Sequence, residues 1–574
     1  MFTDLPPELF VKLLSFLAIQ DIASVILLSK AARILVDSNE SQVYRSAAIF
    51  HGFLTDGALS LEEAKGYEAG SQRWLHEVHS WKAYCRQHMA LQRNWNGDDS
   101  RLSGVSEPLE VKGFNGYGSV FSSAHRFKID EVENTLIYTS EHGGLYVVSV
   151  EDGVPLWSLP EQHVRPYAHV EYDKGYIIFD AFGPMEIWRR STDQLNTQTT
   201  MPCTPRPSQL SVVPVIRSRY LHTAGEGQPH LPRRGAYVPF TMLQSPGHCR
   251  ASRFVHPYML AASTSQGGVA FIWHVPTSTL VQTINIPPLN NALLEWGGDE
   301  NFDEDDIDPD DFESINYVEL SDECVFVCWR NNLVAYSRRP SDSGTLGQVV
   351  FTLSLSARMG DPDFTGRRFP YMSFRMPHHA LSNTSMRSTR IVTCQTLPEV
   401  GRMHVMDHEE FCASHVSPDG RDLVAVTRDG WLFYAPDFLH FGTSRPTSYG
   451  PFRINFPGHL HYLAFDGKRI LIAMTGGIFF ISLENLVYPG ATFRGKSPAV
   501  RRVMCFQPGN SPMDASCAQL TNTAIWLTYS RGPEFMPTNV VTQVDFTHNV
   551  STNNASVHLR SGVSYATVAA RNHI

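Results

Sequence analysis

The chain is 574 residues long, and 42% of its residues are hydrophobic and 11% aromatic, a composition typical of a folded protein with two or more domains. Its formal net charge is −10, but ten acidic residues fall within residues 299–313, where no Lys or Arg occurs. The remainder carries 47 acidic and 47 basic residues, which argues against a general nucleic-acid or anionic-membrane binder.

The first residues, the apolar runs and the cysteines indicate the cellular compartment in which we expect the protein. Asp4 and Glu8 stand near the start with no basic lead, so no secretory signal is expected. No apolar run approaches the ~20 residues that a membrane-spanning helix needs. The nine cysteines are odd in number and show no paired spacing, which fits a reducing compartment. We therefore expect a cytoplasmic or nuclear protein without a membrane partner.

The first 45 residues predict two short helices with apolar side chains on more than one face. Asp4 can cap the first helix, and Asp21 can cap the second. The first helix has one apolar row at Leu9, Leu13, Phe16 and Leu17, and a second row at Phe10 and Leu14. Six of the seven residues from Ile22 to Leu28 are also apolar. A unit this small cannot bury apolar surface all round, so either the rest of the chain covers it or it binds another protein.

Residues 3–48 resemble an F-box. The matching residues are Leu5-Pro6, Glu8-Leu9, Leu13, Leu14, Leu17, Asp21-Ile22, Val25, Leu28, Ser29-Lys30 in place of the usual Cys-Lys, and the closing aromatic Tyr44. One departure is Ala32, where the family often has Trp. The resemblance implies docking onto an Skp-type adaptor and, through it, a cullin scaffold. The candidate adaptor-binding residues are Leu5, Pro6, Leu9, Leu13, Leu17, Ile22, Val25 and Leu28, some of which must fill the unit's own core.

Residues 49–97 predict a helical linker. Trp74, Trp81 and Trp95 stand at multiples of seven, which favours one core-facing helix surface over an aromatic binding cage. The stretch around Trp81 to Trp95 resembles the helix that joins F-boxes to propellers in F-box/WD-repeat proteins. The expected domains are therefore residues 1–48, 49–97 and 98–574.

After Gly97 the chain changes to short β-rich runs separated by glycine turns. The pattern recurs at residues 135–157, 176–188, 259–273, 325–336, 417–434 and 465–481, and residues 523–528 begin a possible seventh copy. Repeated four-stranded meanders predict a β-propeller, because each sheet needs a neighbour on both faces. We expect seven blades, with six to eight possible, and long inserted loops near residues 194–248, 288–313 and 340–390. The fold class is α + β multidomain: a three-helix unit, a helical linker and an all-β propeller.

The repeats resemble degenerate WD repeats. Ser417-Pro418-Asp419-Gly420 matches the family's turn, and Phe271-Ile272-Trp273-His274-Val275 matches its strand-end aromatic. The Trp-Asp dipeptide itself is absent. The resemblance implies a propeller that binds target proteins.

Three motifs suggest chemistry but fit poorly. Residues 490–497 match a phosphate-binding loop, yet Pro498 follows at once and no acidic partner strand is evident, which favours an inter-blade loop. The acidic run 299–313 lacks the glycine and glutamate of a calcium loop, which favours a solvated loop that could still bind a basic segment. His404, His408, Cys412 and His415 have metal-like spacing without a paired Cys-x-x-Cys. We therefore expect no catalytic residues, no cofactor and no metal.

The best hypothesis is a non-catalytic, substrate-recognition subunit of an Skp/cullin/F-box ubiquitin ligase. Its helices would bind the adaptor, and its propeller would bind a target protein whose identity the sequence does not reveal. The alternative is a non-ligase β-propeller interaction scaffold whose N-terminal helices pack on the propeller itself. A propeller enzyme has only the phosphate-loop match in its favour.

Overall fold

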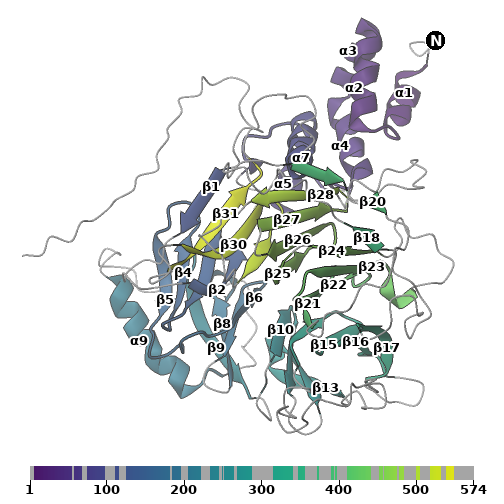
Figure 1. Ribbon diagram of the computed structural model, residues 1–574. Helices are drawn as coiled ribbons and strands as arrows, with labels where there is room; N and C mark the ends of the chain where they lie inside the picture. Colours follow the sequence, from purple (N-terminus) through teal and green to yellow (C-terminus); the bar gives the residue numbers. More distant parts are fainter. Residues whose placement is uncertain are drawn as a thin grey trace, which may run out of the picture.

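The protein consists of an N-terminal helical unit and a seven-bladed β-propeller (Figure 1). The computed structural model describes residues 5–54, 57, 59–67, 74–96, 110–114, 124–180, 184–194, 204–221, 233–244, 249, 251–263, 268–286, 315–340, 347–355, 371–373, 390–393, 395–396, 410–440, 452–456, 458–474, 477–483, 499–504, 517–531 and 538–547. Within these residues, no helix has both the length and the apolar character needed to cross a bilayer.

Among the described residues, six helices precede the propeller. They are α1 (Pro7–Leu14), α2 (Ile19–Leu28), α3 (Lys30–Ser38), α4 (Glu40–Phe50), α5 (Leu61–Tyr67) and α7 (Trp81–Asn96). Pro7 occupies the first turn of α1, where its missing N–H has no helical partner to lose. The hydroxyl of Ser29 caps α3 by accepting a hydrogen bond from the Ala32 N–H at 3.0 Å. Asp21 does not cap α2 as predicted. It lies in the first turn, where a negative charge still favours the helix.

The first four blades follow the chain in order, each with four antiparallel strands. Blade 1 contains β2 (Ala124–Asp130), β3 (Thr135–Ser140), β4 (Leu145–Ser149) and β5 (Pro155–Leu159). Blade 2 contains β6 (Val170–Asp173), β7 (Tyr176–Asp180), β8 (Met185–Arg190) and β9 (Tyr237–Leu243). Blade 3 contains β10 (Ala251–Val255), β11 (Tyr258–Ser263), β12 (Val269–His274) and β13 (Thr279–Asn285). Blade 4 contains β14 (Tyr317–Leu320), β15 (Cys324–Cys328), β16 (Asn332–Ser337) and β17 (Val349–Ser354).

The next two blades carry extra strands on their outer edges. Blade 5 contains β21 (Phe411–Val416), β22 (Leu423–Thr427), β23 (Trp431–Ala435) and β24 (Phe452–Asn455), followed outward by β18 (Tyr371–Ser373) and β20 (Gln395–Thr396). Blade 6 contains β25 (Leu460–Phe465), β26 (Arg469–Met474), β27 (Gly477–Ser482) and β28 (Ala499–Met504), followed outward by β19 (Arg390–Thr393).

Blade 7 closes the ring with strands from both ends of the propeller sequence. It contains β29 (Ala518–Leu520), β30 (Ala524–Arg531) and β31 (Thr538–Asp545), and its outer strand is β1 (Glu110–Phe114). β1 pairs with β31 in antiparallel register from Glu110 opposite Asp545 to Phe114 opposite Val541. The predicted propeller with seven blades is therefore confirmed.

The segment expected as a loop at 194–248 holds more than a loop. It includes α9 (Pro207–Leu221) and the outer strand β9, while α8 (Ser191–Gln194) lies just before it. Pro239 obscured β9 in the sequence, but an outer strand tolerates proline because its free edge needs no N–H donor. In the same way, β17 and β18 lie within the expected loop 340–390. Residues 288–313 lie outside the described residues.

The hydrophobic core of the propeller lies between blades. Each of seven apolar clusters joins two neighbouring sheets, and together they complete the circle from blade 1 back to blade 7. The cluster between blades 4 and 5, for example, packs Phe326 and Phe351 against Phe411 and Phe433. No blade is therefore stable alone, because each buries its faces only against its neighbours.

Ion pairs join the innermost strands around the axis. Lys128 on β2 contacts Glu171 on β6 at 2.9 Å. Arg253 on β10 lies 3.5 Å from Glu171 and 2.9 Å from Glu319 on β14. Glu319 contacts Nδ1 of His415 on β21 at 2.6 Å, so one chain of polar side-chain contacts links five blades.

Candidate docking surface on the N-terminal helices

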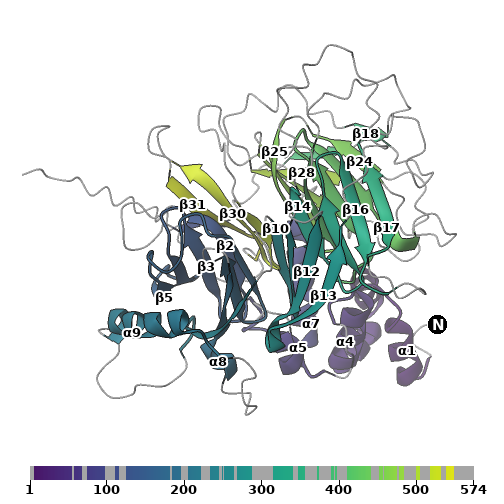
Figure 2. The same cartoon turned by 90° about the horizontal axis from the view of Figure 1, so that it is seen from below.

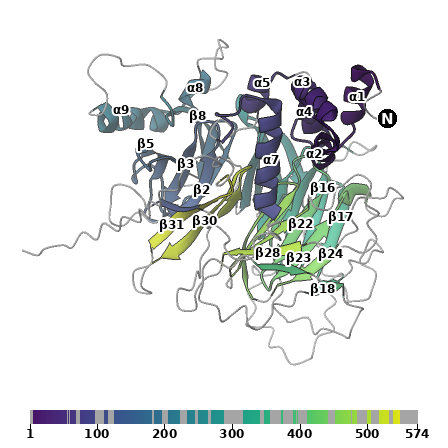
Figure 3. The same ribbon diagram turned by 90° about the horizontal axis from the view of Figure 1, so that it is seen from above.

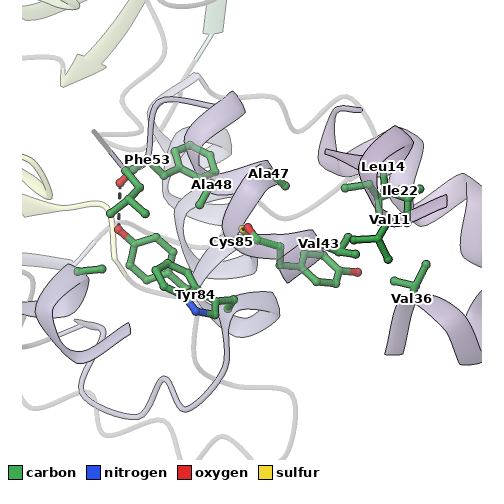
Figure 4. Close-up of a cluster of buried hydrophobic side chains, with 14 of the residues drawn as sticks. Val11, Leu14, Ile22, Val36, Val43, Ala47, Ala48, Phe53, Tyr84 and Cys85 are labelled. Carbon is green, nitrogen blue, oxygen red and sulfur yellow. Dashed lines mark hydrogen bonds between the residues drawn. The ribbon is translucent and has the colours of Figure 1, made fainter. Parts of the chain in front are cut away.

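The helical unit has a hydrophobic core of its own. Its described members all lie between Phe10 and Met89, and none of the described propeller residues contributes to it. Figure 4 shows the core running from Val11 and Ile22 at one end to Tyr84 at the other. The Tyr84 hydroxyl donates to the carbonyl of Phe53 at 3.0 Å, and this bond fixes the chain after α4 against α7.

The two apolar rows predicted for α1 face different surroundings. Phe10 and Leu14, the second row, are both only 2% exposed and lie in the core with Val11. Leu9 of the first row is 55% exposed, and Leu13 is exposed as well. Because one row already fills the core, the other is free to bind a partner.

The next two helices repeat this division. Ile22 on α2 is fully buried, whereas Leu27 and Leu28 at the end of that helix are exposed. On α3, Val36 is buried and Ile34 is exposed. The exposed apolar set therefore comprises Leu9, Leu13, Phe16, Leu27, Leu28 and Ile34. Among the described residues, half of the exposed large hydrophobic side chains lie in residues 9–50, and this set is part of that half.

The eight predicted adaptor-binding residues divide into three groups. Pro6, Leu9, Leu13 and Leu28 are exposed, and Leu5, Leu17 and Val25 are partly buried. Ile22 fills the core, as some of the eight residues were expected to do.

Three residues outside that prediction, Phe16, Leu27 and Ile34, belong to the exposed set. Helical spacing could have found Ile34: Ala32 and Val36, four apart, face the core, so Ile34 between them must face away. Phe16 continues the row of Leu9 and Leu13.

Polar contacts hold α3, α4 and α7 together. Lys82 on α7 contacts Asp37 on α3 at 3.2 Å, and its backbone N–H donates to Glu40 on α4. Burial, helped by the charges of Asp37, Cys85 and Glu40, raises the pKa of Tyr44 to about 12, so this phenol stays neutral in the core. The exposed apolar set is thus carried by a unit that is braced internally.

The far end of α7 anchors the helical unit to the propeller. Trp95 stacks on Phe546 with 3.7 Å between ring centroids and on Phe480 with 5.2 Å. Its indole N–H donates to the Asn522 carbonyl at 3.1 Å, and Arg469 lies 4.2 Å above the ring. Figures 2 and 3 show α1–α5 and α7 on one side of the propeller, and the end of α7 contributes Leu91 and Trp95 to the cluster between blades 6 and 7.

Comparisons with known proteins add little to these observations. No family model matches the chain, and no curated protein matches its sequence. Among solved structures, the chain is similar to the computationally designed Ika8 protein, with 11% sequence identity and a TM-score of 0.35 over 75% of this chain and 98% of that chain. The protein is a seven-bladed β-propeller with N-terminal helices.

The other predicted motifs contribute no site among the described residues. His415 contacts Glu319 through one ring nitrogen and the Leu463 carbonyl, 3.0 Å away, through the other. In the part of the chain that the structure describes, no three His, Cys, Asp or Glu residues gather as metal ligands. His404, His408, the phosphate-loop match at 490–497 and the acidic run at 299–313 lie outside that part.

Proposed function

We propose that this chain is the substrate-recognition subunit of an Skp/cullin/F-box ubiquitin ligase. Its α1–α3 helices bind an Skp-type adaptor, which connects the chain to a cullin scaffold, and its propeller binds a target protein. The chain itself is non-catalytic in this proposal and acts by raising the local concentration of the target. The observation that carries the proposal is the exposed apolar set on a helical unit whose core is already complete without it.

The energetics support a docking role for this set. Burying one Leu or Phe side chain contributes about 1.5–3 kcal/mol. Six exposed apolar residues on α1–α3 and the connection after α1 provide enough apolar surface for a specific complex. The F-box resemblance of residues 3–48 supports an Skp-type adaptor as the partner.

The alternative, a scaffold without a ligase role, requires the N-terminal helices to pack on the propeller. The β-propeller fold is itself compatible with a protein-interaction scaffold. In the part of the chain that the structure describes, however, the helical core contains no propeller residue and the exposed set is accessible to solvent. These two observations favour the ligase proposal.

A binding assay with a purified Skp-type adaptor tests the proposal. Replacing Leu9 and Leu13 with Asp adds two charges to the exposed apolar set, and we expect the affinity to fall about a hundredfold or more. The control is Leu210→Asp on α9, because Leu210 is 51% exposed and lies on a helix of blade 2.

We expect Leu210→Asp to bind the adaptor as the unaltered protein does. Thermal unfolding of all variants should stay nearly unchanged, because the altered side chains are exposed. No adaptor binding by the unaltered protein, or equal binding by the double variant, would exclude the proposed role.

A further inference from the structure

The start of α2 is capped by a residue that follows another helix. Ala18, the N-cap residue of α2, has no side-chain oxygen that could accept a hydrogen bond. The N–H of Ile19, the first residue of the helix, instead donates to Nε2 of His51 at 3.0 Å. His51 is the C-cap residue of α4 and lies 32 residues after Ile19. One ring nitrogen therefore joins the start of α2 to the end of α4.

This hydrogen bond requires a neutral imidazole ring. An N–H donates only to a nitrogen with a free lone pair, so the single ring proton of His51 lies on Nδ1. A protonated ring would offer no acceptor and would place a positive charge at the positive end of the α2 dipole. Burial lowers the pKa of His51 below its usual 6.5, which favours the neutral ring.

The neighbouring elements add few titratable groups around this ring. They are Asp21 in the first turn of α2, which is exposed, and Tyr84 and His88 on α7, which contact Phe53. Burial, helped by the charge of Lys468, lowers the pKa of His88 to about 3, so this second ring is neutral as well. The lowered pKa of His51 is therefore explained by burial.

Aromatic stacking holds the His51 ring in place. The ring stacks on Phe53 with 5.3 Å between centroids, and Phe53 stacks on His88 of α7 with 4.9 Å. Figure 4 shows the hydrogen bond that the Tyr84 hydroxyl of α7 donates to the Phe53 carbonyl. Because Trp95 anchors the far end of α7, a continuous series of contacts leads from the propeller to the start of α2.

The bond lies between the two parts of the exposed apolar set. The exposed residues of α1 and its connection precede Ile19, and Leu27 and Leu28 lie at the other end of α2. Ile22, one turn after Ile19, is the side chain that α2 buries. The orientation of α2 against α4 therefore depends on Ile22 in the core and on His51 at the start of the helix.

We propose that His51 is the positioning residue of the docking surface: its neutral ring fixes the start of α2, and with it the exposed apolar set, relative to the propeller. The inference rests on the proposed function for the identity of the partner, but not for the hydrogen bond. A hydrogen bond sets a direction, because the N–H must point at the acceptor nitrogen. Burial of Ile22 is non-directional and cannot set this orientation alone.

Hydrogen exchange of the full-length protein, without any adaptor, tests this inference. His51→Ala removes the acceptor, and we expect exchange in α2 to become roughly fivefold faster because one hydrogen bond is lost. His51→Gln keeps a side-chain oxygen that can accept from Ile19, and it should restore slow exchange. The matched control is His76→Gln, because His76 is an exposed histidine of the same helical unit, and exchange in α2 should not change.

The pH dependence of exchange separates this hydrogen bond from simple packing of the ring. When α2 opens, the released ring protonates near its usual pKa of 6.5. The contribution of His51 is therefore fully present above that pH and is lost as pH falls toward the lower folded-state pKa. Exchange in α2, corrected for the intrinsic effect of pH on amides, should rise up to about tenfold from about pH 7.5 to about 5.5. In His51→Gln the corrected exchange should stay constant.

Adaptor binding is measured separately on the same variants. His51→Ala should bind a purified Skp-type adaptor about two- to fivefold more weakly, and His51→Gln should bind as the unaltered protein does. If no variant binds the adaptor, the proposed function fails, while exchange in α2 still decides whether His51 fixes the helix. Unchanged exchange in His51→Ala, the same pH response in His51→Gln as in the unaltered protein, or full adaptor affinity in His51→Ala would overturn the inference.

Discussion

Single charged residues on the innermost strands contribute to stability beyond their own blade. Glu319 on β14 is fully buried and contacts both Arg253 on β10 and His415 on β21. Burial raises the pKa of Glu319, but Arg253 and then His415 more than offset burial, so the net pKa is lowered. The carboxylate is therefore charged and holds three blades together.

Glu319→Gln tests this role, because the amide keeps the shape but removes the charge that Arg253 needs. Removing one partner of a buried ion pair costs about 3–5 kcal/mol, and we expect that loss in the free energy of unfolding measured with urea at neutral pH. The control is Glu323→Gln, which alters an exposed pair with Arg339 and should cost less than about 1 kcal/mol.

The pH dependence of the free energy of unfolding is a second measurement of the role of Glu319. A carboxyl with a lowered folded-state pKa stabilises the fold fully above its unfolded pKa, about 4.3, and this contribution is lost as pH falls through the folded value. The unaltered protein should therefore lose stability below about pH 4.3 more steeply than Glu319→Gln. Parallel stability curves for the two proteins would contradict the role assigned to Glu319.

At the scale of elements, α7 shows what the spacing of apolar residues predicts about a helix and what it does not predict. The spacing of Trp74, Trp81 and Trp95 predicts a single core-facing surface, and both Trp81 and Trp95 are buried. Trp81 packs in the helical core, however, while Trp95 packs between blades 6 and 7. Helical periodicity shows which residues share an apolar face of the helix. It does not show that this face packs against the helical core at one end and against the propeller at the other.

The strands show the same limit. Runs such as Val325–Cys328 and Ile470–Met474 were predictable because turns flank continuous apolar stretches. The ion pairs of the inner strands were not predictable, because the positions of Lys128 and Arg253 in their strands follow the alternating pattern that is typical of solvent-exposed residues. Packing of blades 1, 2 and 3 against one another brings them to Glu171, and this packing depends on contacts between segments distant in sequence.

Trp95→Ala tests whether α7 fixes the helical unit to the propeller. The change removes the stacking on Phe546 and Phe480, which should lower the free energy of unfolding by about 3–5 kcal/mol. We also expect faster amide hydrogen exchange along α7, because its end loses its anchor. Hydrogen exchange followed by mass spectrometry measures this directly.

Trp157→Ala is the matched control, because Trp157 is equally buried but lies between blades 1 and 2. It should lower stability to a similar extent and leave exchange in α7 unchanged. Unchanged α7 exchange in Trp95→Ala would show that other contacts hold the helices in place.

At the scale of the whole molecule, the ring depends on one pairing between distant parts of the chain. The other six blades take their four central strands from consecutive segments, whereas blade 7 needs β1 from before blade 1. The strand also lies between α7 and β2 in sequence, so the helical unit and the ring closure are directly connected. Opening this pairing would leave blade 7 with three strands and release both ends of the propeller.

Replacing residues 110–114 with a Gly-Ser linker of equal length tests the closure. The linker keeps the chain connected but removes the strand opposite Val541 to Asp545, because glycine and serine form strands poorly. We expect a lower urea midpoint and faster exchange throughout β31, with the effect spreading into blade 1 through the cluster that packs Trp526 against Phe127. An unchanged urea midpoint and unchanged exchange in β31 after the replacement would refute closure by β1.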